Sequence, residues 1–301
     1  MSKKAIVNIV CGIAAIGLLV AGYFMFVRQS DAPINLGYTL INVSPDEVER
    51  VIVRMYDFEF TLENWDGEWS VFGDDITRLD QALVREFVQS AASVVSAERV
   101  SEGETDLAQF GLGEPSGVVE VRHYSGEPHT LQIGDLDGEY YFVNTFQNPG
   151  NVYTLHESRV TALLAPIDEL RDRAVSPLSE DEITHINITR EVGGEVEEIA
   201  MDMLDDTTAA NITFRLATLR IAEFVEFGAV SLSDVGLDEP NYIIEFGNSE
   251  RRFTLYIGRR DEERGLSYAR VEPNYPNAGI FMLSNEDISF KDMMVRELVN
   301  D

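Results

Sequence analysis

The sequence has a single cysteine, Cys11, which lies inside an apolar N-terminal run. A disulfide requires two cysteines, and zinc sites built on thiolates require more than one, so neither is available to the rest of the chain. Histidine is also scarce, with four residues, and none of them forms the His-Glu-x-x-His pattern of a zinc hydrolase. We therefore predict no metal ion and no cofactor.

Basic side chains are few. The chain has 23 Lys and Arg against 53 Asp and Glu, which gives a formal net charge of −30. Proteins that bind phosphate backbones need clustered Lys and Arg, so we predict that nucleic acid is not a partner. Acidity of this size is typical of a solvated surface, with binding of cations or of a basic partner as the alternative.

The sequence contains no recognisable catalytic arrangement. There is no Gly-x-Ser-x-Gly nucleophile elbow. Carboxylates are so numerous that no pair of them stands out as the acid and base of a glycosidase. His123 and His129 flank a Ser-Gly turn and are interpreted as a surface pair across a hairpin. We predict no catalytic residues and a protein that is not an enzyme.

Three acidic stretches lie in predicted loops. Asp135–Glu139 resembles the start of a calcium loop but lacks the remaining ligands, so we interpret it as a hairpin tip. Glu180–Glu182 and Asp261–Glu263 are interpreted as solvated charge, with weak calcium binding as the alternative. An envelope ligand-binding protein or hydrolase that uses these loops is the alternative to a non-catalytic role.

Ala5–Val27 is the one long hydrophobic run. It reaches the roughly 20 residues that a transmembrane helix needs. Lys3 and Lys4 precede it and acidic sequence follows, so the positive-inside rule places the N-terminus in the cytoplasm and the remainder outside the membrane. A cleaved signal peptide is the alternative, but its apolar core is usually about 7–15 residues long. We predict an uncleaved, single-pass anchor.

A ten-residue stretch occurs twice, at Asp106–Pro115 and at Ser231–Pro240. Both copies are followed by Leu-x-Ile-Gly, at Leu131–Gly134 and Leu255–Gly258. We interpret the shared glycine as a turn residue with positive φ, the leucine as a core residue and the proline as the start of an edge strand. A loop that contacts a ligand is the alternative. The residues shared by the two copies are Gly111, Leu112, Glu114, Pro115, Gly236, Leu237, Glu239 and Pro240.

Short apolar runs that alternate with turns predict strands in both halves. Apolar spacing predicts long helices at about 77–93 and 208–227, and terminal helices at 159–174 and 290–298. Pro166 is expected to kink or split the helix at 159–174. The predicted fold is α+β: an N-terminal transmembrane helix, then two tandem, similar modules of mostly antiparallel sheet, each with one long and one terminal helix. The predicted divisions are 1–30 (cytoplasmic N-terminus and anchor), 31–45 (linker), 46–175 (first module), 176–182 (linker) and 183–301 (second module).

The order of these parts resembles the bacterial domain-of-unknown-function family 4340. The residues that carry the resemblance are Trp69, Leu107–Pro115, Leu131–Gly134, Tyr140, Tyr141 and Leu170–Asp172. The resemblance covers the chain as two copies, and the second lacks the Trp65–Trp69 turn.

The resemblance implies a membrane-anchored, extracytoplasmic accessory component of an ABC-type transport system. The expected partners are the membrane and an ABC permease or gliding-type auxiliary subunits. The family carries no established catalytic residues that could be transferred to this chain. The sequence leaves the oligomeric state open.

Overall fold

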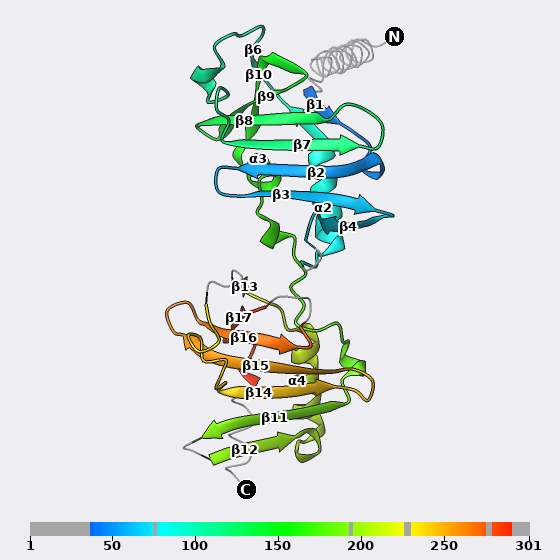
Figure 1. Cartoon of the computed structure of the whole chain (residues 1–301), viewed down its shortest axis with the longest axis vertical. Helices are drawn as coiled ribbons and strands as arrows, with labels where there is room; N and C mark the ends of the chain where they lie inside the picture. Colours follow the sequence, from blue (N-terminus) through cyan, green and yellow to red (C-terminus); the bar gives the residue numbers. More distant parts are fainter. Residues whose placement is uncertain (1–36, 75–76, 193–194, 226–229, 275–278, 291–301) are drawn as a thin grey trace, which may run out of the picture.

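The structure, a computed structural model, describes residues 37–74, 77–192, 195–225, 230–274 and 279–290. Strands dominate the described chain, and all pairings between its named strands are antiparallel. They form two large sheets, which lie one beyond the other along the long axis of the molecule (Figure 1).

The first sheet has eight strands in the order β4-β3-β2-β7-β8-β9-β10-β6. A separate two-stranded sheet pairs β1 (Tyr38–Asn42) with β5 (Ser93–Ser96). The strands of the large sheet are β2 (Val48–Met55), β3 (Glu59–Trp65), β4 (Glu68–Val71), β6 (Arg99–Ser101), β7 (Gly117–His123), β8 (His129–Asp137), β9 (Tyr140–Thr145) and β10 (Asn148–His156).

The second sheet has seven strands in the order β12-β11-β14-β15-β16-β17-β13. Apart from β4, which has no counterpart, this order is that of the first sheet with β11 in the place of β2, β12 in that of β3, and β13 in that of β6. The strands are β11 (His185–Val192), β12 (Glu195–Ala200), β13 (Glu223–Phe224), β14 (Tyr242–Gly247), β15 (Arg252–Asp261), β16 (Leu266–Glu272) and β17 (Phe281–Ser284).

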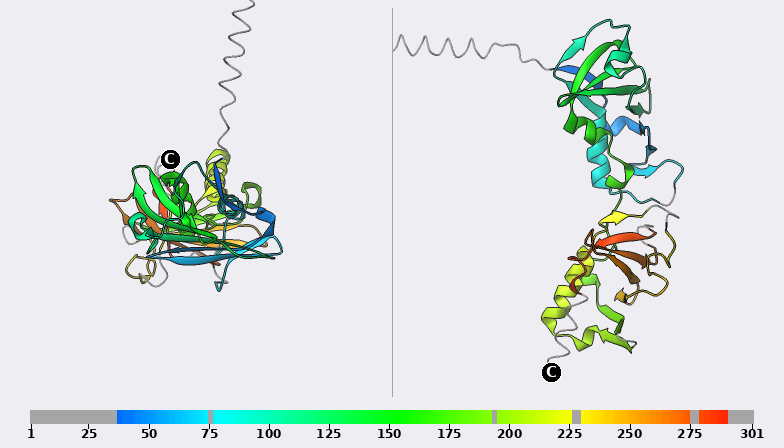
Figure 2. Two further views of the ribbon diagram at one scale, coloured as in Figure 1. Left: turned by 90° about the horizontal axis from the view of Figure 1, so that it is seen from above. Right: turned by 90° about the vertical axis from the view of Figure 1, so that its left-hand side faces the viewer.

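Each sheet is covered by a helix on one face, as Figures 1 and 2 show. Side chains alternate between the two faces of a strand. In β2, Val51 and Val53 are buried in the first core, whereas Arg50 and Arg54 lie on the open face. There Arg50 contacts Glu63 at 3.5 Å and Arg54 contacts Glu59 at 3.2 Å, both across to β3. The open face is thus polar and ion-paired, and the two cores lie on the helix side.

The helix of the first sheet, α2 (Gln81–Ala92), begins four residues later than the predicted start at residue 77. Asp80 is its N-cap, because its carboxylate accepts hydrogen bonds from the backbone N–H groups of the second and third helical residues. Phe87 and Val88 are buried against the sheet, whereas Leu83, one turn earlier on the same helix, is 38% exposed. Ser93, the residue after α2, already belongs to strand β5.

The predicted terminal helix at 159–174 is not continuous but is split before Pro166, as the proline predicts. The chain instead forms the short α3 (Glu157–Leu163), and Pro166 then precedes the 3₁₀-helix η3 (Ile167–Glu169). Proline lacks an N–H group and excludes the residue before it from helical geometry, which ends the helix. The predicted helix at 208–227 is also too long, because α4 (Asp206–Thr218) ends where the chain turns toward β13.

These differences correct the predicted fold class. The described chain is mostly antiparallel sheet with three short α-helices, not an α+β fold with a long and a terminal helix in each module. No helix among the described residues has the length and apolar character needed to cross a bilayer. The run at 5–27 that was predicted as the anchor, and most of the predicted helix at 290–298, lie outside the described residues.

We predict that the two cores unfold separately. Phe87 is buried, and its ring centroid lies 6.4 Å from that of Phe60. Replacing Phe87 by alanine should therefore lower the free energy of unfolding of the first module by about 3–5 kcal/mol. Both tryptophans of the chain, Trp65 and Trp69, lie in that module, so their fluorescence in a urea titration reports its unfolding alone.

Two matched variants test this prediction. Leu83 lies on the same helix, but its side chain is already partly exposed to water. Leu83→Ala should therefore lower the free energy of unfolding much less than Phe87→Ala. Leu216→Ala removes a buried residue of the second core and should leave the tryptophan transition in place. Equal shifts of that transition by Phe87→Ala and Leu216→Ala would show one cooperative unit instead of two.

Candidate functional site

The first copy of the repeated motif forms a tight turn. It runs through the 3₁₀-helix η2 (Leu107–Phe110) and ends at Gly111, whose φ is 70°. The N–H of Leu112 donates to the carbonyl of Leu107 at 3.1 Å, and the Leu112 side chain is buried. A Cβ on Gly111 would overlap Asp135, and one on Gly134 would overlap the Phe110 carbonyl. The two glycines thus allow the turn and strand β8 to meet backbone to backbone.

The second copy repeats this contact. Gly236 has a φ of 68°, and the N–H of Leu237 donates to the carbonyl of Leu232 at 2.8 Å. The Leu237 side chain is buried, and a Cβ on Gly258 would overlap the carbonyl of Val235. The N–H of Arg259 donates to that same carbonyl at 2.7 Å.

The remaining motif residues occupy matching environments in the two copies. Glu114 and Glu239 are exposed, and Pro115 and Pro240 are half-buried. Neither glutamate side chain takes part in the contact between turn and strand. The motif therefore has a structural role in both copies, and its two glutamates are the only side chains of the set that face water.

The histidines do not gather into a site. His123 and His129 stack across the β7–β8 hairpin with ring centroids 5.9 Å apart. Partial burial, and next the neighbouring His123, lower the pKa of His129. His156 caps α3, since its ring nitrogen accepts from the N–H of Ser158 at 3.2 Å, and His185 begins β11. Within the described ranges, no group of three or more His, Cys, Asp or Glu could hold a metal ion.

Two of the three acidic stretches contribute a carboxylate to contacts within the fold. Hydrogen bonds from the backbone N–H and hydroxyl of Ser179 lower the pKa of Glu182, which also pairs with Arg251. Asp261 accepts from the backbone N–H of Arg264 at 3.1 Å. Asp135–Glu139 spans the end of β8 and the turn to β9, where Gly138 has a φ of 63°. These carboxylates shape turns and do not converge on a common point.

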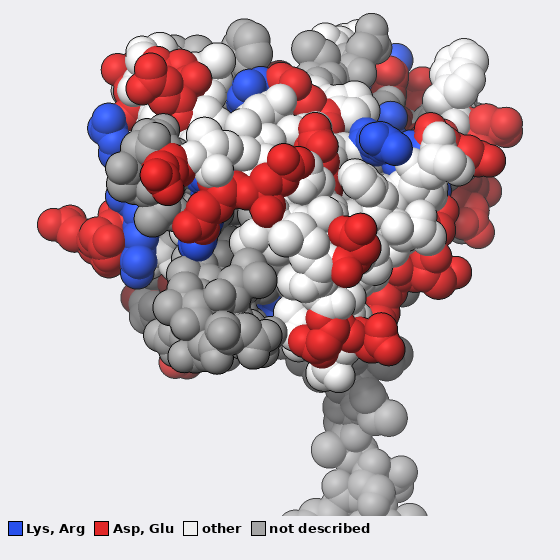
Figure 3. Space-filling view, turned by 90° about the horizontal axis from the view of Figure 1, so that it is seen from below, with Lys and Arg blue, Asp and Glu red and all other residues white. Residues whose placement is uncertain are grey.

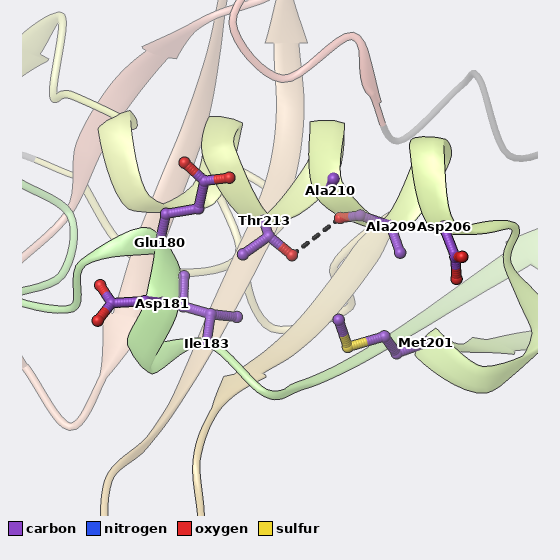
Figure 4. Close-up of a pocket in the computed structure, with 8 residues that line it drawn as sticks. All are labelled: Glu180, Asp181, Ile183, Met201, Asp206, Ala209, Ala210 and Thr213. Carbon is purple, nitrogen blue, oxygen red and sulfur yellow. Dashed lines mark hydrogen bonds between the residues drawn. The ribbon is translucent and has the colours of Figure 1, made fainter.

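One open groove of about 510 Å³ lies between α4 and the 3₁₀-helix η4 (Glu180–Glu182). Figure 4 shows that the carboxylates of Glu180, Asp181 and Asp206 point in different directions. Thr213, on the helix wall, uses its hydroxyl to donate to the carbonyl of Ala209 at 2.8 Å. The groove offers neither a pair of converging carboxylates nor a free buried polar group.

The segment between the two sheets is hydrogen-bonded to both sides. On the first side, the N–H of Asp172 donates to the carbonyl of Arg78 at 3.0 Å. On the second side, Arg173 donates to the carbonyl of Ala222 at 2.7 Å, and the guanidinium of Arg171 lies 3.5 Å from the centre of the Phe224 ring. The Leu170–Asp172 motif noted in the sequence therefore lies at the junction of the two modules.

Fold and sites together define a class of protein: two successive antiparallel sheets, each with one covered face, joined by a hydrogen-bonded connector. Residues 69–211 match the model of the family described as "Domain of unknown function (DUF4340)". This match supports assignment to that family over a range that begins in β4, crosses the junction and ends in α4. No curated protein and no solved structure matches the chain.

The family match leaves two further predictions without support. The family is described only as a domain of unknown function, so the match does not support the predicted role as a transporter accessory protein. The match is also a single range across both modules and does not by itself show two copies of the family. The prediction of a membrane-spanning helix likewise finds no support among the described residues.

We predict that Gly111→Ala destabilises the first module by more than the roughly 1–2 kcal/mol that a positive φ costs a residue with a Cβ. The excess comes from the overlap with Asp135. Gly138→Ala is the matched control, because its φ is 63° but no atom lies within 4 Å of its Cβ. Urea unfolding followed by tryptophan fluorescence measures both. An equal loss of unfolding free energy in the two variants would contradict the close contact between turn and strand.

Proposed function

We propose that this chain is a non-catalytic interaction component of a larger assembly, in which two modules are held in a defined relative position. The junction carries this proposal. Within three consecutive residues, Asp172 donates a hydrogen bond to the first module, Arg173 donates one to the second, and the Arg171 side chain stacks on Phe224 of the second. A connector fixed on both sides keeps the surfaces of two modules at a constant separation, as a scaffold requires.

The distribution of charge supports a role in contacts with other molecules. Acidic side chains predominate over the end of the molecule shown in Figure 3, and Lys and Arg are scattered among them. A surface of one sign steers oppositely charged partners and repels like-charged ones.

We propose further that the two modules arose as tandem copies of one unit. The shared strand order supports this, as do the glycine contacts of Gly111 with β8 and of Gly236 with β15. The correspondence also extends upstream of the repeated motif. Ser44 precedes η1 (Pro45–Glu47) just as Ser179 precedes η4, and each 3₁₀-helix leads into the first strand of its large sheet.

We propose an ABC permease or a gliding-type auxiliary subunit as the partner, and the outer side of the cell membrane as the location. The partner rests on the family resemblance of the sequence alone. The location rests on Lys3 and Lys4 before the apolar run at 5–27 and on the acidic sequence after it.

The partner is tested by affinity purification of the full chain from detergent-solubilised membranes. We expect a permease or its ATPase to be recovered and identified by mass spectrometry. The control carries residues 1–36 fused to an unrelated soluble domain and should recover neither. If the full chain recovers no transporter subunit while other membrane complexes stay intact, the partner is wrong.

The location is tested by adding protease to spheroplasts. We expect digestion of the region after residue 36, because the acidic part of the chain is proposed to lie outside the membrane. A cytoplasmic protein should stay intact in the same sample and be digested after lysis. Protection of the region after residue 36 until lysis would refute this orientation.

A further inference from the structure

Three hairpin turns at one end of the first sheet each carry an exposed aromatic residue. Trp65 ends β3 and is 82% exposed, Tyr124 follows β7 and is also exposed, and Phe146 follows β9 and is 71% exposed. In the sheet order β3-β2-β7-β8-β9 with antiparallel pairing, β3, β7 and β9 run in one direction. Figure 1 shows β3 and β7 pointing the same way. The residues after these strands therefore meet at the same sheet end.

Hydrogen bonds join the three turns. The hydroxyl of Tyr124 donates to the carbonyl of Asn64 at 3.4 Å, next to Trp65. The N–H of Phe146 donates to the carbonyl of Thr130 at 3.0 Å, and the side chain of Gln147 donates to the carbonyl of Pro128 at 2.5 Å. Alternate strands lie about 10 Å apart, so the three aromatic residues span about 20 Å. We call Trp65, Tyr124 and Phe146 the aromatic row.

The fold itself does not require this row. The turn after β14, the counterpart of the turn after β7, carries Asn248, Ser249 and Glu250 in place of aromatic residues. The hairpin that presents Trp65 is formed with β4, the strand that has no counterpart in the second sheet. Large aromatic side chains that are exposed together are characteristic of binding surfaces, because water contact is unfavourable for them and docking removes it.

The charges around the row define the partner. Three exposed carboxylates lie on the turns themselves, Asp66, Glu68 and Glu127, and a fourth, Glu47, ends the 3₁₀-helix η1 just before β2. The nearby cation Arg122, two residues before Tyr124, is ion-paired with Glu120. The backbone carbonyl of Glu47 accepts from the N–H of Tyr124 at 3.2 Å, and Glu68 lies opposite Trp65 in the β3–β4 pairing. Aromatic faces attract cations, and neighbouring carboxylates pair with them. A bilayer with anionic head groups would be repelled by the same carboxylates.

We propose that the aromatic row binds an Arg- or Lys-rich segment of a partner protein. This inference rests on the proposed interaction function, and it identifies the surface through which the first module contacts its partner. The cationic side chains stack on Trp65 and Phe146 and pair with the carboxylates beside them, while the second module does not contribute to this contact.

The test measures binding of a fluorescein-labelled peptide of alternating Arg and Ser to the purified full chain by fluorescence anisotropy. Trp65→Ala combined with Phe146→Ala leaves the net charge unchanged, so a loss of affinity cannot come from long-range attraction. We expect the affinity to fall at least about tenfold. Tyr56→Ala, at a fully exposed aromatic in the turn from β2 to β3 at the opposite sheet end, should have no effect.

A second pair of variants tests the carboxylates. Asp66→Asn with Glu127→Gln should weaken binding clearly more than Asp137→Asn with Glu139→Gln, which removes the same charge from the turn at the opposite end of the sheet. Tryptophan-detected unfolding confirms that each variant is folded. Equal affinities for the two aromatic variants, or for the two charge variants, overturn the proposal.

Binding to vesicles of phosphatidylglycerol and phosphatidylethanolamine tests the alternative that the aromatic row contacts lipid. Binding of wild type to these vesicles that is lost in Trp65→Ala/Phe146→Ala, without binding to the peptide, would identify the row as a lipid contact and overturn the proposal. Affinity purification separates this surface from the wider function. If that double variant still recovers the transporter subunit as wild type does, the aromatic row is not the binding surface, but the proposed interaction function is retained.

Discussion

The contact between a glycine turn and a glycine in the neighbouring strand underlies both halves of this protein. At Gly111 and Gly134, and again at Gly236 and Gly258, backbone meets backbone at a distance that leaves no room for a Cβ at one or both positions. This contact sets the turn against the second strand of each meander and directs the adjacent leucine into the interior. Because backbone atoms make the contact between turn and strand, the glutamate side chain of each turn takes no part in that contact and stays exposed to solvent. The strand order that follows is the same in both modules.

One-sided sheets explain the remaining architecture. Each sheet places aliphatic residues under its helix and ion pairs on its open face, as Val51 and Arg50 illustrate. An open polar face does not drive the two modules together, so their relation depends on the connector. The cation–π contact of Arg171 with Phe224 and the backbone hydrogen bond of Asp172 to Arg78 supply that relation. The connector thereby takes part in the structure on both sides and is more than a spacer.

The sequence allowed good predictions where a local rule operates. Strand alternation, the hairpin at Asp66–Gly67 and the turn at Gly111 follow from side-chain periodicity and from the freedom of glycine at positive φ. The helices were predicted less well, because apolar spacing continued past their ends. Asp80 sets the start of α2 and was readable as a cap, whereas Pro166 had been identified as the point where the terminal helix is kinked or split. The match of Ser44–Glu47 with Ser179–Glu182 was also readable and would have extended the repeat upstream.

By itself the sequence determined the acidity of the chain, the absence of thiol chemistry outside residue 11 and the position of the repeated turn, because each depends on residue type or short spacing. Only the tertiary structure decided which distant residues meet. Trp65, Tyr124 and Phe146 are separated by many residues and share no motif, yet antiparallel pairing brings the turns after β3, β7 and β9 to one sheet end. Likewise, the bonds of residues 171–173 to both modules depend on where the segments before α2 and after α4 lie in space. Long-range pairing has no local signature, and this is why the candidate surface emerged only from the fold.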